Sequence, residues 1–210
     1  MQFDYRFKRT FNMKCCVKQG LIVSVLCLSF LAISGMTEIR AQNLAVKTNL
    51  LYDATATINI GAEIALAPEW TLDVSGNYNA WDWKDNRKWR HFLIQPEARY
   101  WFCEKFNGHF IGLHMHGGQF NTGNVCTPFG LFGDCSTTRH EGWYYGAGIS
   151  YGYQWILGDR WNFELNIGAG YVGSDYGVYE RPVCGAYLGP EHQDWFGITK
   201  ASVSIIFLIF

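Results

Sequence analysis

Apolar and polar residues alternate over long stretches of this chain, most clearly between Glu141 and Val172. From 143 to 155, every second residue is aromatic or aliphatic, and the residues between them are mainly small or polar. The same alternation resumes from 161 to 171, after a turn at 157–160. Because successive side chains of a strand point to opposite faces, the pattern predicts an antiparallel hairpin with one apolar face and one small, polar face.

The same alternation, followed along the chain, predicts eight strands, at 44–52, 57–66, 70–79, 90–102, 109–119, 141–156, 161–172 and 196–210. The connections alternate between tight turns (67–69, 103–108, 157–160) and longer segments (53–56, 81–89, 121–140, 173–194). An even number of strands, with short turns at one end and long loops at the other, is typical of outer-membrane barrels. Pro96 cannot donate a ladder hydrogen bond, so we expect a bulge or a local gap in the fourth strand.

The volume inside such a barrel indicates which face points inward. An eight-stranded barrel has an interior just wide enough for ordinary side chains, and the apolar faces of these strands carry too many rings to fit there. Glycine, serine and asparagine fit easily. We therefore predict an all-β, eight-stranded antiparallel up-and-down transmembrane β-barrel with its rings toward lipid. A two-sheet sandwich could hold more rings and remains an alternative.

The start of the chain has the features of a signal peptide. Residues 1–19 are basic, 21–33 form an apolar run too short to span a membrane as a helix, and Ala41 offers a small residue for cleavage. We predict a signal peptide over 1–41 and the barrel over 42–210. A start at Met13 gives a more compact signal and is an alternative, as is an uncleaved N-terminal anchor.

Cleavage changes the charge of the chain. It removes six basic and two acidic residues, so 17 basic and 18 acidic residues become 11 and 16, a net charge of −5. An acidic mature chain gives no support for nucleic-acid binding. No later apolar run reaches the length of a membrane-spanning helix, so any crossing of a membrane must use strands.

Tryptophans gather at the predicted strand ends, as expected for the aromatic girdles at two membrane interfaces. The tight turns are flanked by Trp70, Trp101, Trp155 and Trp161, and the long loops by Trp81, Trp83, Trp89, Trp143 and Trp195. The last strand ends on an aromatic residue, Phe210, which is typical of strands read by the barrel-insertion machinery. Lys200 and Ser202 share the parity of Phe210, so this strand contains a bulge or has a mixed lower end.

Charged residues on the inward parity predict a polar network in the lumen. Its expected members are Lys47, Glu63, Asp73, Glu97, Arg99, His114, His116, Glu164 and Lys200. Because isolated buried charges are costly, these groups should pair with one another. The result would be a closed barrel with negligible conductance and no cofactor.

Cysteines and histidines suggest further chemistry. An exported chain permits disulfides, and Cys126–Cys135 within one long loop is the first choice, with Cys184 as the alternative partner of either. A metal cluster of these cysteines with His140 or His192 matches no standard zinc spacing. His114 and His116 are interpreted as lumen residues hydrogen-bonded to Glu97 or its neighbours rather than as metal ligands.

Catalysis has little support in the sequence. A lipid-acting enzyme of the outer membrane would need a nucleophile or base at the lipid-facing rim. His91 and Ser150 are candidates, but both lie among residues of inward parity. We predict no catalytic site, no cofactor site and no metal site.

Four motifs resemble a known family: residues 45–53, 95–101, 106–110 and 151–155. They are similar to an uncharacterised domain-of-unknown-function family, number three-five-seven-five, found in exported proteins of gut-dwelling Gram-negative anaerobes. The resemblance covers the mature chain and implies a small barrel of the outer-membrane-protein-A type. It also implies an association of some relatives with surface-fimbria systems, and it brings no activity or catalytic residue.

We therefore expect a non-enzymatic protein of the cell outer membrane. Its outer loops, 81–89, 121–140 and 173–194, would contact an extracellular or fimbrial partner. The apolar outer faces of its strands would contact outer-membrane lipid. The alternatives are a lipid-modifying barrel enzyme of the outer membrane and a soluble periplasmic ligand-binding β-barrel.

Overall fold

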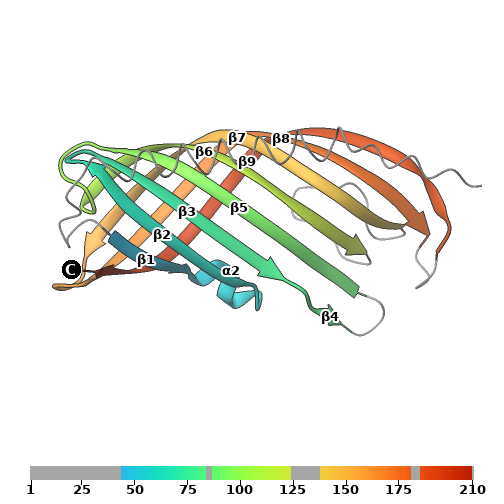
Figure 1. Cartoon of the computed structure of the whole chain (residues 1–210), viewed down its shortest axis with the longest axis horizontal. Helices are drawn as coiled ribbons and strands as arrows, with labels where there is room; N and C mark the ends of the chain where they lie inside the picture. Colours follow the sequence, from blue (N-terminus) through green and yellow to red (C-terminus); the bar gives the residue numbers. More distant parts are fainter. Residues whose placement is uncertain (1–43, 84–86, 124–137, 181–184, 210) are drawn as a thin grey trace, which may run out of the picture. The chain divides into compact units, whose positions relative to one another are not determined.

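The strands of this protein form one closed ring (Figure 1). A computed structural model describes residues 44–83, 87–123, 138–180 and 185–209. Its elements are β1 (Leu44–Asn49), α2 (Leu50–Ala54), β2 (Ile58–Ala67), β3 (Trp70–Asn79), β4 (Asp82–Trp83), β5 (Arg87–Trp101), β6 (Gly108–Gly123), β7 (Thr138–Ile156), β8 (Trp161–Glu180) and β9 (Tyr187–Ile209). Apart from the two-residue β4, eight antiparallel strands pair in an up-and-down ring, which confirms the predicted all-β, eight-stranded barrel fold.

The register of the ladders shows that the strands are tilted in the barrel wall. The paired positions run Leu208, Ala45, Glu63, Asp73, Glu97, His114, Gly148, Gly170, Gly197. One circuit of the ring therefore returns to β9 at Gly197 rather than at Leu208. Such a stagger is what a small closed barrel requires.

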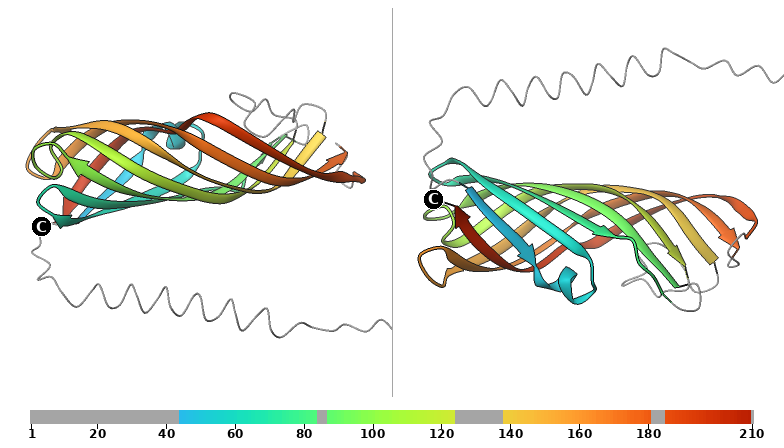
Figure 2. Two further views of the ribbon diagram at one scale, coloured as in Figure 1. Left: turned by 90° about the horizontal axis from the view of Figure 1, so that it is seen from above. Right: turned by 60° about the horizontal axis from the view of Figure 1, so that its bottom comes forward.

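The wall of the barrel is low on one side and tall on the other (Figures 1 and 2). β1 has 6 residues and β2 has 10, whereas β8 has 20 and β9 has 23. The tight turns gather at the end that holds the C-terminal end of β9, and β7, β8 and β9 extend beyond the tops of β1–β3 at the other end. Below, we call this tall part of β7–β9 the outer wall.

Apolar side chains cover the outside of the ring. Ile60, Leu113, Met115, Ile149 and Ile167 are each more than half exposed. Glutamate, lysine, arginine and asparagine side chains fill the inside. Glycines make room among them: a Cβ on Gly152 would lie 2.2 Å from Cζ of Phe110, whose ring is fully buried.

Several predicted boundaries were wrong. The first strand does not continue to Tyr52, because Asn49 caps α2 by accepting a hydrogen bond from the Leu51 N–H. The predicted loop at 173–194 is mostly sheet, since β8 runs to Glu180 and β9 starts at Tyr187. The predicted loop at 121–140 is shorter as well, because β6 extends to Gly123 and β7 begins at Thr138.

Two expected irregularities take a definite form. Pro96 makes a gap rather than a bulge: β5 keeps one register with β6 on both sides of it, at Ile94 and at Glu97. In β9 a bulge lies at Thr199, because Gly168 pairs with Lys200 whereas Ala169 pairs with Ile198. The lower end of β9 is also mixed, since Ile206 points inward and is fully buried.

The predicted signal peptide at 1–41 and the residues Cys126, Cys135 and Cys184 lie outside the described residues. Among the described residues, no helix is long and apolar enough to cross a bilayer.

The glycine that faces Phe110 gives a stability test. We expect Gly152→Ala to lower the free energy of unfolding by about 1–3 kcal/mol, because the added methyl group overpacks a full interior. Gly76→Ala is the matched control, since a Cβ there meets no atom within 4 Å. Urea titrations of both variants in one detergent, followed by tryptophan fluorescence, compare them. Equal midpoints would contradict the tight packing.

Candidate functional site

Three carboxylates lie side by side across the ladders of neighbouring strands. Glu63 pairs with Asp73, and Asp73 pairs with Glu97. Each is at most 1% exposed. Like charges placed directly opposite one another destabilise a sheet, so this row requires cations close by.

Arg99 supplies the central cation and spans the lumen. Its Nε lies 2.6 Å from Glu97 Oε2, and its Nη1 lies 2.8 Å from Glu63 Oε2. Its two Nη atoms also contact both oxygens of Glu164, on β8, at 2.8 and 3.1 Å. The planar guanidinium fork suits this bidentate contact, which connects β5 to the opposite wall of the barrel.

Two lysines complete the cluster. Lys47 Nζ lies 2.9 Å from Asp73 Oδ2 and 3.2 Å from Glu63 Oε2. Lys200 Nζ lies 2.9 Å from Glu97 Oε2 and 3.6 Å from Asp73 Oδ2. The sequence interpretation thus named all seven charged members of this cluster, and the structure brings them together.

Neutral polar groups that the interpretation did not name complete the network. Thr71 donates to Glu63 at 2.6 Å, and Ser150 and Asn166 donate to Glu97. All three lie on inward parity beside residues that were named, so the alternation could have found them. Ser150, at 2% exposure, therefore binds the cluster inside the barrel and does not lie on its outer face.

An apolar floor closes the lumen below the charges. Ala45, Phe106 and Ile206 form a buried cluster at the end with the tight turns. The ring of Trp101 packs on those of Phe106 and Phe110, and the Arg99 guanidinium lies 4.5 Å above the Phe110 ring. This geometry is a buried cation–π contact.

An aromatic layer lies in the lumen above the charges, mainly on the side of β5–β8. It consists of Leu93, Phe120, Tyr144, Val172, Tyr176 and Val178, with Tyr52 and Trp195 packed against it. Tyr52 comes from α2, so the short helix contributes a ring to the layer from the low side of the wall. The charged cluster therefore lies between two apolar layers.

Histidines lie between the cluster and this layer. His114 and His116 are both buried, and their ring centroids are 6.0 Å apart. His114 Nε2 lies 2.8 Å from Thr199 Oγ1, so its hydrogen-bond partner is this threonine rather than Glu97. Among the described residues, no group of three or more histidine, cysteine or acidic side chains is placed to hold a metal ion.

Two tryptophans assigned to the girdles point inward instead. Trp101 is fully buried and donates to Thr71 Oγ1 at 2.9 Å, because it shares the parity of Arg99. Trp195 points inward because the bulge at Thr199 shifts the alternation of β9 by one residue. The other named girdle residues are exposed, each by between 41% and 60% of its surface: Trp70, Trp81, Trp143, Trp155 and Trp161. Cys103 is exposed and free.

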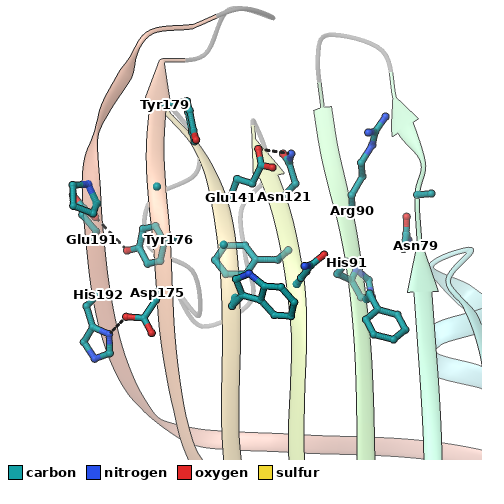
Figure 3. Close-up of a pocket in the computed structure, with 18 of the residues that line it drawn as sticks. Asn79, Arg90, His91, Asn121, Glu141, Asp175, Tyr176, Tyr179, Glu191 and His192 are labelled. Atoms are coloured by element: carbon teal, nitrogen blue, oxygen red, sulfur yellow. Dashed lines mark hydrogen bonds and ion pairs between the residues drawn. The ribbon is translucent and has the colours of Figure 1, made fainter. Parts of the chain in front are cut away.

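Above the aromatic layer lies a cavity of about 890 Å³, formed by β3 and β5–β9 (Figure 3). Its polar lining includes Asn79, Arg90, His91, Asn121, Glu141 and Glu191. Asn121 donates to Glu141 at 3.0 Å, and the Tyr176 hydroxyl donates to Glu191 at 3.3 Å. His91, a candidate rim base in the sequence interpretation, lies in this lining beside the rings of Tyr52 and Trp89.

The outer wall carries an exposed acid–histidine pair on β8 and β9. His192 Nδ1 lies 2.6 Å from Asp175 Oδ1, and its Nε2 lies 3.1 Å from Asp194. The hydrogen bond with Asp175 raises the pKa of His192, and the hydrogen bond from Tyr171 lowers the pKa of Asp194. These groups give the outer wall a polar exterior, in contrast to the apolar exterior lower on the same strands.

These features define the class of protein: an eight-stranded, antiparallel up-and-down barrel with a charged interior. The chain belongs to the family described as Protein of unknown function (DUF3575), whose model matches residues 26–209. Comparison with curated proteins gave no match, and comparison with solved structures gave none either.

Removing the central cation should destabilise the barrel strongly. Arg99→Met leaves Glu63, Asp73, Glu97 and Glu164 without their shared partner, and we expect a loss of about 3–5 kcal/mol in the free energy of unfolding. Arg139→Met is the control: Arg139 lies 3.9 Å from the exposed carboxylate of Glu141 and 4.6 Å above the Tyr179 ring. We expect its loss to be smaller, about 1–2 kcal/mol, because this pair is open to water on the Glu141 side. Urea titrations measure both. A tolerated Arg99→Met variant would show that the carboxylates do not depend on this arginine.

Proposed function

We propose that this protein is a non-enzymatic outer-membrane barrel with a sealed lumen, whose outer wall and mouth contact a partner outside the cell. The observation that carries the proposal is the distribution of side chains along β8. From Trp161 to Tyr171 its outward residues are aromatic or aliphatic, except for one alanine, and its inward residues are polar or glycine. From Val172 to Val178 the inward residues are Val172, Ser174, Tyr176 and Val178, mostly apolar, and the outward residues are Gly173, Asp175 and Gly177.

This change along β8 supports a membrane boundary near Tyr171. Below Tyr171, apolar side chains face outward, as expected for a surface in contact with lipid. Above it, Asp175 faces outward and Val172, Tyr176 and Val178 are buried, as expected for a surface in contact with water. Ten residue steps at about 3.4 Å, tilted by about 40°, give a belt about 26 Å high, close to the apolar band of outer-membrane barrels. Tyr171 is also a suitable residue for that interface.

The filled lumen supports a role other than transport. The Arg99 cluster occupies the centre, and an apolar layer lies at each end of it. A pore would need a wide polar path, whereas the polar-lined cavity that adjoins the cluster holds only about 30 Å³. Within the described residues, accessible polar groups gather at the mouth cavity and on the outer wall, which supports contact with a partner there.

A lysine on the belt tests the membrane location. We expect Ile149→Lys, at a residue 68% exposed, to reduce folding into lipid vesicles with a loss of about 2–4 kcal/mol, because lysine at the middle of a bilayer is costly. Tyr187→Lys, on the outer wall at 57% exposure, should fold normally. Gel mobility with and without boiling reports the folded fraction. Equal folding of both variants would count against a membrane barrel.

A second measurement tests the sealed lumen. Protein reconstituted in a planar bilayer should show negligible conductance, because the Arg99 cluster and its two apolar layers leave no wide water path. A porin reconstituted in the same bilayer is the positive control. Steady, large openings from the folded protein would contradict the seal.

A further inference from the structure

β9 has an edge without a strand partner. On one side it pairs with β8 along nearly its whole length, but on the other side β1 pairs only with Ser204–Ile209. The side chain of Asn49 then bonds the Ala201 carbonyl and the Val203 N–H. Within the described part of the chain, no strand pairs with this edge from Tyr187 to Ile198.

The alternation of the ladder identifies the main-chain groups on this edge. The main-chain N–H and C=O groups of Ala201 and Val203 point toward β1. The bulge at Thr199 then shifts the alternation by one residue. Above the bulge, the residues with outward side chains therefore direct their main-chain groups to the open edge. They are Pro190, His192, Asp194, Phe196 and Ile198.

The upper and lower parts of this edge differ. Proline and charged residues are the usual means of protecting an edge strand, and Pro190, His192 and Asp194 provide them above. Below them, Phe196 is 77% exposed and Ile198 is 46% exposed. These two residues lie where β9 enters the apolar belt, and an unpaired main-chain group beside lipid is costly.

A second copy of this chain cannot cover the edge in the same membrane. Two copies there are related by an axis along the membrane normal, and strands tilted by about 40° would then cross at about 80° instead of aligning. An extended peptide has no such constraint. Strand addition of this kind gains its affinity from main-chain hydrogen bonds and its specificity from alternate side chains.

We propose that the free edge of β9 from His192 to Ile198 binds an extended peptide segment of a partner protein as an added antiparallel strand. This inference rests on the proposed function and specifies its partner. Opposite Phe196 and Ile198 the segment would carry apolar, β-branched residues, and opposite Asp194 a basic residue. Its alternate side chains would face the mouth of the barrel, next to the inward side chain of Trp195.

A designed peptide tests this edge on the wild-type protein in detergent. The probe is fluorescein-labelled Val-Thr-Val-Thr-Lys-Thr-Thr, whose two valines and lysine would pair with Ile198, Phe196 and Asp194. Fluorescence anisotropy should show saturable binding. A peptide N-methylated at the two valines and the lysine should bind at least about tenfold more weakly, because three main-chain donors are lost. The same peptide N-methylated at its first three threonines is the matched control and should bind normally.

Variants of the edge provide the second arm. Phe196→Pro removes one donor from the edge and should weaken binding of the unmodified peptide about tenfold. Pro190→Ala lies outside the paired stretch and should leave the affinity unchanged. Gel mobility with and without boiling shows whether each variant is folded, and the two methylated peptides test the same contact without any variant. Absent binding, or equal binding of the two methylated peptides, would overturn the inference, while a folded, membrane-inserting barrel would leave the proposed function standing.

Discussion

The contact of Arg99 with four carboxylates is the interaction on which the barrel depends. Closing the ring places Glu63, Asp73 and Glu97 in a row across three neighbouring strands, an arrangement that repels itself unless cations lie within it. Arg99 meets this row and also reaches Glu164 on the far wall, while the two lysines bind at its sides. The cluster thus couples register, closure and charge: a one-residue slip of β3 would move Asp73 out of the lumen and leave the cations unmatched.

The interior needs small residues because this cluster and its two apolar layers already fill it. Gly152 lies under Phe110, and Gly146 and Gly148 lie beside His116 and His114. The exterior differs, since many aliphatic and aromatic side chains on it are exposed among the described residues. Such an exterior is suited to apolar surroundings, so the same alternation that builds the fold also supports the proposed location.

The unequal height of the barrel wall is the feature most relevant to the proposed function. The short β1 ends in α2, and α2 contributes Tyr52 to the aromatic layer. On the tall side, β8 and β9 continue beyond the belt as a sheet with polar side chains outward. The mouth cavity and the open edge of β9 both follow from this difference in strand length. Among the described strands, β1 is too short to pair with the upper half of β9.

The sequence by itself determined the antiparallel ring, the inward face of most strand positions and the charged members of the lumen, because a period of two is a local property of a strand. Trp101 could also have been placed inside from its parity with Arg99. Only the tertiary structure decided the features that depend on neighbouring strands. Cross-strand pairing extended β8 and β9 through a predicted loop, and the bulge at Thr199 turned Trp195 inward. The paired positions around the ring brought Arg99 to Glu164, a contact between residues far apart in the chain that no local pattern encodes.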